Sequence, residues 1–328
     1  MHSAVEDVGV VLIGRNEGAR LTACMASLGP LASRSVYVDS GSTDGSVEAA
    51  RRMGLTVVLL DAGTPFTAAR ARNAGFAELM RTAPALDFVQ FVDGDCRIAA
   101  GWIEKARAFL LNRDDAAIVC GRRRERFPDA SIYNAICDRE WDTPVGEAIA
   151  CGGDCLVRSS AFRAVGGYAP DLIAGEEPEM CLRLREAGWS IWRIDAEMTL
   201  HDAALTHFFQ WWRRSVRAGH AYAEVAARHR TSPKRIWSQN VRRAVLWGGL
   251  LPLLAVSGSL AIHPAFLALL AAYPLQIARL AVRSDLPRPD NWRHSFFMVI
   301  GKFAEMQGVC AYYLNRLCNR RQTLIEYK

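Results

Sequence analysis

The chain has 328 residues with a formal net charge of +6, and 51% of its residues are hydrophobic. This length suits one large α/β domain with an appendage, and so modest a basic excess does not indicate a nucleic-acid-binding protein. Nine scattered cysteines without a C-x-x-C pair indicate reduced thiols in the cytosol and argue against a disulfide framework or a zinc site.

The first 95 residues alternate between short apolar runs and helical patterns. Val8–Ile13 is typical of a buried strand and runs into a glycine-bounded loop, residues 14–18. Further strands are expected over residues 35–38, 55–60 and 88–92, and helices over 21–28, 46–53 and 66–80. This alternation predicts an α/β fold with a doubly wound, mostly parallel sheet and helices on both of its faces.

The second predicted strand ends in Asp39, which begins the polar loop of residues 39–45. A carboxylate at a strand end can accept hydrogen bonds from a ribose or a base. Ser42, Thr43 or Asp44 can cap the helix that follows, and a simple helix start is the alternative interpretation for these three. No G-x-G-x-x-G follows the first strand, so the pattern does not indicate a dinucleotide-binding fold.

Two carboxylates follow the strand of residues 88–92 as Asp93-Gly94-Asp95. Ligands bind at the carboxyl ends of strands in open α/β sheets, and Gly94 is expected to let the backbone turn sharply there. Like charges this close favour a cation between them, and hard divalent ions prefer oxygen ligands and substrate phosphates. The pattern predicts a Mg²⁺ or Mn²⁺ site for a diphosphate, with an ordinary acidic turn as the alternative.

Four segments in this order resemble the family 2 glycosyltransferases, whose nucleotide-binding half has the GT-A fold. The matching segments are Arg15-Asn16-Glu17, residues 39–45, residues 70–75 and residues 91–95. The resemblance covers about residues 8–215 and implies that Asp93 and Asp95 are a D-x-D pair, with Asp95 the more direct metal ligand. It implies nucleotide-sugar binding by Ile13, Arg15, Asn16, Glu17, Asp39, Ser42, Arg72, Asp93 and Gly94.

The same resemblance implies an acceptor side and a general base. Residues 152–158 would line the acceptor side of the cleft, through Gly153 and Asp154. The family usually has Glu-Asp before its Leu-Arg-Leu-x-x-x-Gly-Trp segment, and the second acid deprotonates the acceptor hydroxyl. Glu177 stands in that position here, and the neighbouring Glu176 could substitute for it. Simple acidic residues at a helix N-terminus are the alternative.

Three further segments allow two interpretations each. The basic run of residues 122–126 is interpreted as a solvated strand end or an acceptor-loop cluster. His201 is either structural or, by the resemblance, the residue that completes the metal shell. The aromatic, basic stretch from His207 is similar to the Gln-x-x-Arg-Trp region of membrane family members. It would either gate the acceptor or anchor a helix at a membrane surface, through Trp211, Trp212, Arg213 and Arg214.

Residues 244–278 contain no charged side chain apart from His263. This stretch is too long for one membrane span, and breaks near residues 257–264 predict two helices, about 243–260 and 264–282. Arginines at both outer ends predict a hairpin with both ends cytoplasmic, and a buried hairpin in a soluble protein is the alternative. Residues 295–318 carry Lys302, Glu305 and Arg316, which favours an interfacial helix, and the basic tail should lie on an anionic leaflet.

These inferences predict a glycosyltransferase domain in residues 1–230 and membrane-associated helices in residues 231–328. By the resemblance, the protein would transfer a sugar with inversion from a nucleoside-diphosphate sugar, a UDP-sugar foremost, to a lipid-linked or glycan acceptor. It would lie at the cytoplasmic (inner) membrane with its catalytic domain facing the cytosol, use Mg²⁺ or Mn²⁺, and have no nucleic-acid partner. A sugar nucleotidyltransferase and a non-catalytic nucleotide-binding membrane scaffold are the alternative functions.

Overall fold

The computed structural model describes residues 5–284 and 289–318. The chain divides into two compact units. The first contains the residues up to 129 together with 137–204, and the second contains 130–136 together with the residues from 205 onward. Helix α8 (Phe208–Arg228) belongs to the second unit, where it packs against the last helix, whereas the sequence interpretation placed it in the domain of residues 1–230.

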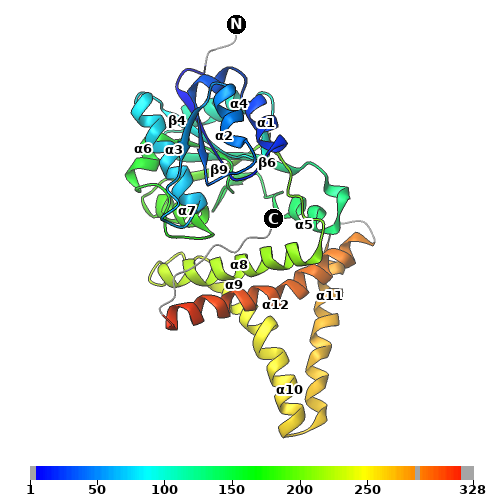
Figure 1. Cartoon of the computed structure of the whole chain (residues 1–328). Coiled ribbons are helices and arrows are strands. Elements are labelled where there is room, and N and C mark those ends of the chain that lie inside the picture. Colours follow the sequence, from blue (N-terminus) through cyan, green and yellow to red (C-terminus); the bar gives the residue numbers. More distant parts are fainter. Residues whose placement is uncertain (1–4, 285–288, 319–328) are drawn as a thin grey trace. The chain divides into compact units, whose positions relative to one another are not determined.

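Four parallel strands form the first half of the sheet in the order β3-β2-β1-β4, and Figure 1 shows helices on both sides of the sheet. The strand register pairs Gly14 with Asp39 and Ile13 with Asp93, so both carboxylates lie at the same edge, on either side of β1. Right-handed crossovers place α1 and α2 on one face and α3 on the other. The elements are β1 (Val8–Gly14), α1 (Ala19–Ala26), β2 (Ser35–Asp39), α2 (Ser46–Arg52), β3 (Thr56–Leu59), α3 (Ala68–Thr82) and β4 (Phe88–Asp93).

The second half of the sheet is mixed. β8 (Cys155–Arg158) runs antiparallel between β4 and β6 (Ala116–Glu125), and β9 (Ser190–His201) pairs parallel with β6. Two short antiparallel partners of β9, β5 (Cys96–Ile98) and β7 (Gly146–Glu147), were not predicted because so few residues carry no readable pattern. The GT-A-like α/β fold class is confirmed, and the parallel pairing is concentrated in its first half.

The remaining helices of the first unit cover this sheet. The core is continuous from β1 to β9, and buried polar groups within it are paired: the Trp102 indole N–H donates to Gln90 Oε1 at 2.8 Å. Helix α4 spans Trp102–Leu111. The other helical segments are η1 (Gly29–Arg34), η2 (Pro128–Ala130), α6 (Ser159–Ala164) and α7 (Glu176–Glu186). Helix α5 (Ile132–Glu140), which was not predicted, belongs to the second unit up to residue 136 and to the first unit from residue 137.

In the second unit, α8 packs against α12 (Asp290–Leu317) through glycines. A Cβ atom at Gly219 would overlap the carbonyl oxygen of Glu305, and one at Gly308 would overlap that of Val216. The two backbones therefore touch, as they do where small residues line a helix crossing. The interfacial helix expected over residues 295–318 is part of α12, which begins five residues earlier.

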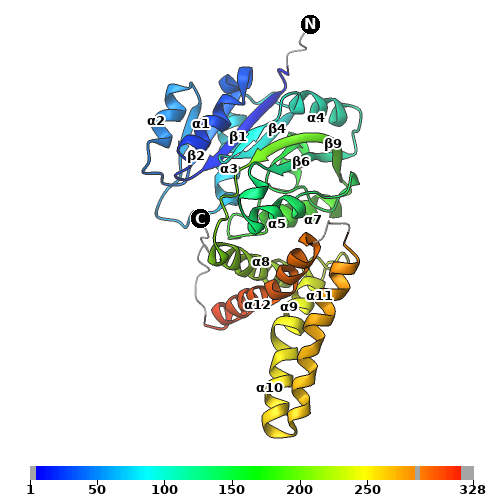
Figure 2. The same cartoon turned by 90° about the vertical axis from the view of Figure 1, so that its right-hand side faces the viewer.

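Two helical segments form the predicted hairpin, side by side in Figure 2. Ser238–Ala261 and Pro264–Val282 are each long and apolar enough to cross a membrane, judged by length and composition only. They consist of α9 (Ser238–Val245), the π-helical turn η3 (Leu246–Leu250) and α10 (Leu251–Ala261), then η4 (Pro264–Ala271) and α11 (Ala272–Val282). The predicted break near residue 263 is confirmed, whereas Arg288 and the basic tail from residue 319 lie outside the described residues.

Candidate active site

Asp39 lies at the end of β2 with only 3% of its surface exposed. Its Oδ2 accepts hydrogen bonds from the backbone N–H groups of Gly41 (2.9 Å) and Ser42 (2.8 Å), and its Oδ1 accepts one from the Tyr37 hydroxyl (2.9 Å). The carboxylate therefore shapes the loop of residues 39–45. The sequence predicted that Asp39 binds a nucleotide. In this structure its hydrogen bonds stay within the protein and would hold that loop rigid around a nucleotide.

The loops after β1 and β2 are tied to each other. Asn16 adopts φ +55°, a backbone region that asparagine tolerates better than most residues. Its N–H donates to Ser42 Oγ at 2.9 Å, and its Oδ1 accepts from the Thr43 N–H at 2.7 Å. Two more of the predicted binding residues lie in this loop: the Arg15 guanidinium stacks over the Phe66 ring, and the Glu17 carboxylate pairs with Arg20 at 2.7 Å.

Gly94 lies in the expected turn, between β4 and β5, and its φ is not positive. Its N–H donates to the Ile13 carbonyl oxygen at 2.8 Å, and a Cβ atom would lie only 3.1 Å from that oxygen. This bond ties the Asp93-Gly94-Asp95 turn to the end of β1, which is how Ile13 contributes to the site.

Arg72 connects two acidic side chains in the interior. The Thr67 hydroxyl caps the N-terminus of α3 by accepting a hydrogen bond from the Arg70 N–H. In the same helix, the Arg72 guanidinium reaches Asp93 Oδ1 and Glu176 Oε1, both at 2.7 Å. Only 3% of Arg72 is exposed. Its guanidinium therefore positions Asp93. The resemblance had implied a different role for Arg72, direct contact with the nucleotide sugar.

The Asp93 carboxylate is held ionised by its neighbours. Burial alone would raise its pKa, but the Arg72 guanidinium, and then that of Arg123, more than offset this and hold the pKa below its ordinary value. Gly153 faces this cluster from the other side, where a Cβ atom would lie 2.8 Å from an Arg72 nitrogen and 3.0 Å from Asp93 Oδ2. A side chain at position 153 would therefore crowd the Arg72–Asp93 pair.

Asp154 lies beneath the site with no exposed surface. Its Oδ1 accepts the Asp93 N–H at 3.0 Å, and its Oδ2 accepts the Thr199 hydroxyl at 2.7 Å and pairs with Arg123 at 3.0 Å. These contacts occupy both oxygens and correct the expectation that Asp154 faces an acceptor. It supports Asp93 from below.

Arg123 was missed by the sequence interpretation of the basic run of residues 122–126. β6 continues through this run to Glu125, so Arg122 and Arg123 point into the protein instead of into solvent. Arg123 pairs with Asp154 and lies 3.9 Å from Asp93 Oδ2. The signal available in the sequence was a cluster of arginines directly after an apolar strand that belongs to the same sheet as the Asp93-Gly94-Asp95 turn.

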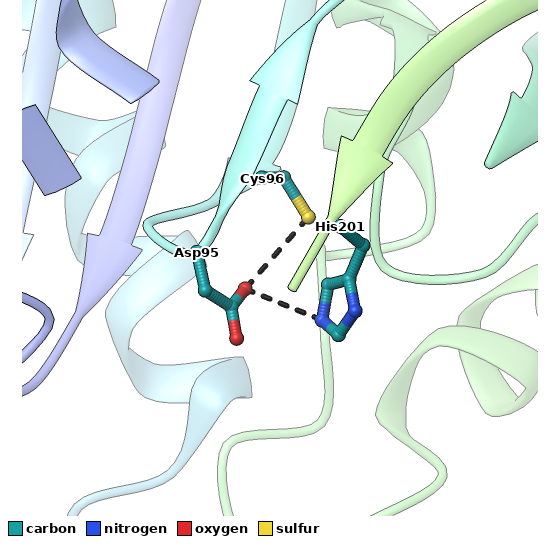
Figure 3. Close-up of side chains that lie close together, drawn as sticks. All are labelled: Asp95, Cys96 and His201. Atoms are coloured by element: carbon teal, nitrogen blue, oxygen red, sulfur yellow. Dashed lines mark hydrogen bonds and ion pairs between the residues drawn. The ribbon is translucent and has the colours of Figure 1, made fainter. Parts of the chain in front are cut away.

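Asp95, in the turn between β4 and β5, faces His201 at the end of β9, as Figure 3 shows. His201 Nε2 lies 3.3 Å from Asp95 Oδ1, and the Cys96 thiol contacts the same oxygen at 3.7 Å. On its other side, His201 Nδ1 lies 3.8 Å from Glu125 Oε2 and has no hydrogen-bond partner among the described residues. Burial would lower the pKa of His201, but Asp95 more than offsets this and raises it.

This group could hold a divalent ion. A carboxylate and an imidazole within one coordination sphere suit Mn²⁺, and a carboxylate behind the far ring nitrogen is the usual support of a ligating histidine. Burial raises the pKa of the Cys96 thiol well above its ordinary value, so this soft ligand stays protonated and donates to Asp95. The donor set that fits an ion is therefore Asp95 and His201, close to Asp93.

Glu177 lies in the first turn of α7 with 5% of its surface exposed. Its Oε1 accepts the Cys151 N–H at 2.7 Å and contacts the thiols of Cys181 (2.8 Å) and Cys151 (3.1 Å). Burial raises the pKa of Glu177, although these three donors act in the opposite direction. Glu176, by contrast, is committed to Arg72 through an ion pair.

The aromatic, basic residues assigned to the acceptor lie in the second unit. Trp211 is 3% exposed and packs between the rings of Tyr133 and Phe297, so its ring is not available to stack on a sugar. The Trp212 N–H donates to Gln307 Oε1 at 2.9 Å. Arg213 is exposed and Arg214 half-buried. At Trp211 the acceptor-gating expectation is therefore corrected, because helix packing uses this side chain.

Known proteins are similar to this chain in sequence or in fold. The model of the family "Glycosyl transferase family 2" matches residues 10–162. The Pre-mycofactocin glycosyltransferase of Mycobacterium tuberculosis is 29% identical over 247 residues, 69% of this chain and 49% of the relative. The Succinoglycan biosynthesis protein ExoA of Rhizobium meliloti is 28% identical over 202 residues, 57% of this chain and 60% of the relative. The chain thus spans about half the length of the first of these.

Among solved structures, the mannosyltransferase PcManGT from Pyrobaculum calidifontis, in complex with GDP-Man and Mn²⁺, superimposes with a TM-score of 0.59. The match covers 95% of this chain and 87% of that one at 17% sequence identity. At this identity the likeness shows a shared fold.

Proposed function

Because the chain carries a glycosyl transferase family 2 domain in residues 10–162, we propose that it transfers a sugar from a nucleoside-diphosphate sugar to an acceptor hydroxyl, with inversion. The observation that carries this proposal is the meeting of Asp95 and His201 beside Asp93, at the sheet edge where Asp39 also ends its strand. That edge has one carboxylate loop for a nucleoside and one for a metal-bound diphosphate.

The donor would bind between these two loops. Asp39 and the tied loops of residues 14–18 and 39–45 would hold the nucleoside, while Asp95 and His201 would hold Mg²⁺ or Mn²⁺. When bound, the ion supplies positive charge that stabilises the leaving diphosphate. Arg72 keeps Asp93 ionised, and Asp154 holds its backbone in place before donor arrives. The GDP-Man and Mn²⁺ in the similar structure of PcManGT support this arrangement. A UDP-sugar is our proposed donor.

Glu177 is the proposed general base. It would take the proton of the acceptor hydroxyl while that oxygen bonds to the anomeric carbon and the bond from this carbon to the diphosphate oxygen breaks. A carboxylate whose pKa is raised by burial is better matched to this task near neutral pH than an ordinary one. Glu176 supports this choice, because its carboxylate is already paired with Arg72.

We further propose that the protein acts at the cytoplasmic membrane on a lipid-linked or glycan acceptor, with its catalytic unit in the cytosol. The two apolar helical segments support membrane association by their length and composition. Their arginines, Arg242 and Arg243 before the hairpin and Arg279 and Arg283 at its end, support cytoplasmic placement of both ends. The similarity to a succinoglycan biosynthesis protein supports a cell-surface glycan as the product.

Nucleotide binding tests the proposal. We expect UDP, among UDP, GDP, CDP and dTDP, to raise the melting temperature of the detergent-purified protein with Mn²⁺ and not with EDTA, because the ion links Asp95 to the diphosphate. Asp95→Asn should abolish the shift, since it removes the carboxylate charge at the ion. A shift that persists in Asp95→Asn or in EDTA would contradict the metal site. Diphosphate released from a sugar phosphate would instead identify a nucleotidyltransferase, and no donor turnover would identify a scaffold.

Gly153→Ala should lose most of this Mn²⁺-dependent shift. The new methyl group would push Arg72 away from Asp93 and cost about 1–3 kcal/mol of stability, the usual cost of overpacking. The matched control is Gly152→Ala, where φ is +80° and the Cβ atom meets open space. It should lower stability through backbone strain alone and keep the nucleotide shift. Equal retention of the shift in both variants would contradict the role assigned to Gly153.

A further inference from the structure

A cavity of about 430 Å³ lies within the helical unit, between the start of the hairpin, its return helix α11 and α12. Its polar lining consists of Arg243, Gln276, Arg279, Arg283 and Lys302, and its apolar lining includes Trp247. Arg243 stands where the first apolar segment begins and Arg279 and Arg283 stand where the second ends, so all three belong to the open end of the hairpin. The volume falls in the usual range of small-molecule sites.

The charges that line this cavity are not balanced. Over residues 5–284 and 289–318, Arg243, Arg279 and Arg283 form no ion pair with a carboxylate, whereas Lys302 is paired with Glu305 at 2.6 Å. Guanidinium groups that converge on one cavity repel each other unless an anion lies between them. Their planar donor pattern matches phosphate oxygens, often in pairs. The side chains that line the cavity therefore favour binding of a phosphate group.

The apolar surroundings indicate where that phosphate comes from. Trp247 and Leu280 line the same cavity, and both candidate membrane spans lead away from it. Tryptophan is favoured at the boundary between headgroups and hydrocarbon. We propose that this cavity binds the phosphate of a membrane lipid, with the lipid's chains lying along the hairpin. The inference rests on the proposed membrane attachment and is independent of the sugar-transfer chemistry.

The test compares two neighbouring arginines in the full-length protein. Arg242 and Arg243 are both exposed at the same end of the same helix, but only Arg243 lines the cavity. Binding of polyisoprenyl phosphate and of phosphatidylglycerol would be titrated in nanodiscs of neutral phosphatidylcholine. We expect Arg243→Gln and Arg279→Gln to weaken binding about tenfold or more, the size of a lost charged hydrogen bond, and Arg242→Gln less than about threefold.

The outcomes separate a built site from general surface charge. Selective weakening in Arg243→Gln supports the site, and whichever lipid binds more tightly names the source of the phosphate. Equal weakening by Arg242→Gln and Arg243→Gln, no binding of either lipid, or equally tight binding of inorganic pyrophosphate alone would each overturn it. The nucleotide-induced shift, measured on the same variants, should not change. Its absence in the wild-type protein would count against the proposed function without touching this site.

Discussion

Glu177→Gln should lose sugar transfer by about 10²–10⁴-fold while it binds donor as the wild-type protein does. The amide keeps the shape of the side chain and can still accept the Cys151 N–H, but it cannot take a proton from the acceptor hydroxyl. Turnover with a UDP-sugar, together with the Mn²⁺-dependent nucleotide shift, separates catalysis from binding. Wild-type turnover in this variant would exclude Glu177 as the base.

The neighbouring Glu176→Gln is the matched control. It breaks the ion pair with Arg72, so it should weaken metal-dependent donor binding more than it slows the bound enzyme. The pH profile gives a second readout. Because burial raises the pKa of Glu177, the wild-type rate should fall with decreasing pH already above about pH 4.3, the ordinary pKa of glutamate. If Glu176→Gln alone removed this acid limb, the two roles would be exchanged.

Arg72→Met should cost about 3–5 kcal/mol of stability, since it leaves the Asp93 and Glu176 carboxylates without their shared counter-charge in the interior. Chemical denaturation in detergent measures this loss. The matched control is Arg70→Met on the same helix. Arg70 bonds only to backbone carbonyls of an exposed loop, Asp61, Thr64 and Pro65, so its loss should cost about 1 kcal/mol.

The stability deficit of Arg72→Met should depend on pH with a defined sign. Arg72 holds the pKa of Asp93 below its unfolded value of about 3.9, so the stabilisation is present above that pH and is lost as the pH falls through the folded-state pKa. The variant should therefore approach the wild type in acid and differ most near neutral pH. A deficit that does not change between pH 7 and pH 3 would show that packing, and not charge, is responsible.

The sequence predicted the first half of the fold because that half is locally encoded. Each strand from β1 to β3 is followed by a helix with readable spacing, and parallel pairing then brings Asp39 and Asp93 to one edge. The second half depends on distant partners. β6 and β9 pair with register shifts near Arg122. Inward-facing and outward-facing side chains therefore do not alternate regularly there, and the sequence does not show which arginines point inward. Arg123 and Asp154 find each other only in the folded sheet.

The same reason explains the errors in the second unit. The aromatic, basic pattern from His207 is typical of several kinds of helix. The role of Trp211 depends on its packing against Phe297 of α12, a helix that is distant in sequence. Glu177 shows the opposite limit. Its position next to Glu176 was readable, and Cys181, whose thiol contacts its carboxylate, lies one turn further along the same helix. The second thiol, that of Cys151, comes from a distant loop that no local pattern connects to Glu177.

The glycine contacts between α8 and α12 have a consequence for biosynthesis. Roughly 60 residues, including the whole hairpin, separate these helices in the chain. At about 5–20 residues per second, α8 leaves the ribosome several seconds before the surface that receives it. During that interval the groove around Gly219 and the Trp211 ring are uncovered, so the nascent chain depends on a chaperone or on its own hairpin for protection. A stop codon before residue 290 would make that vulnerable state permanent.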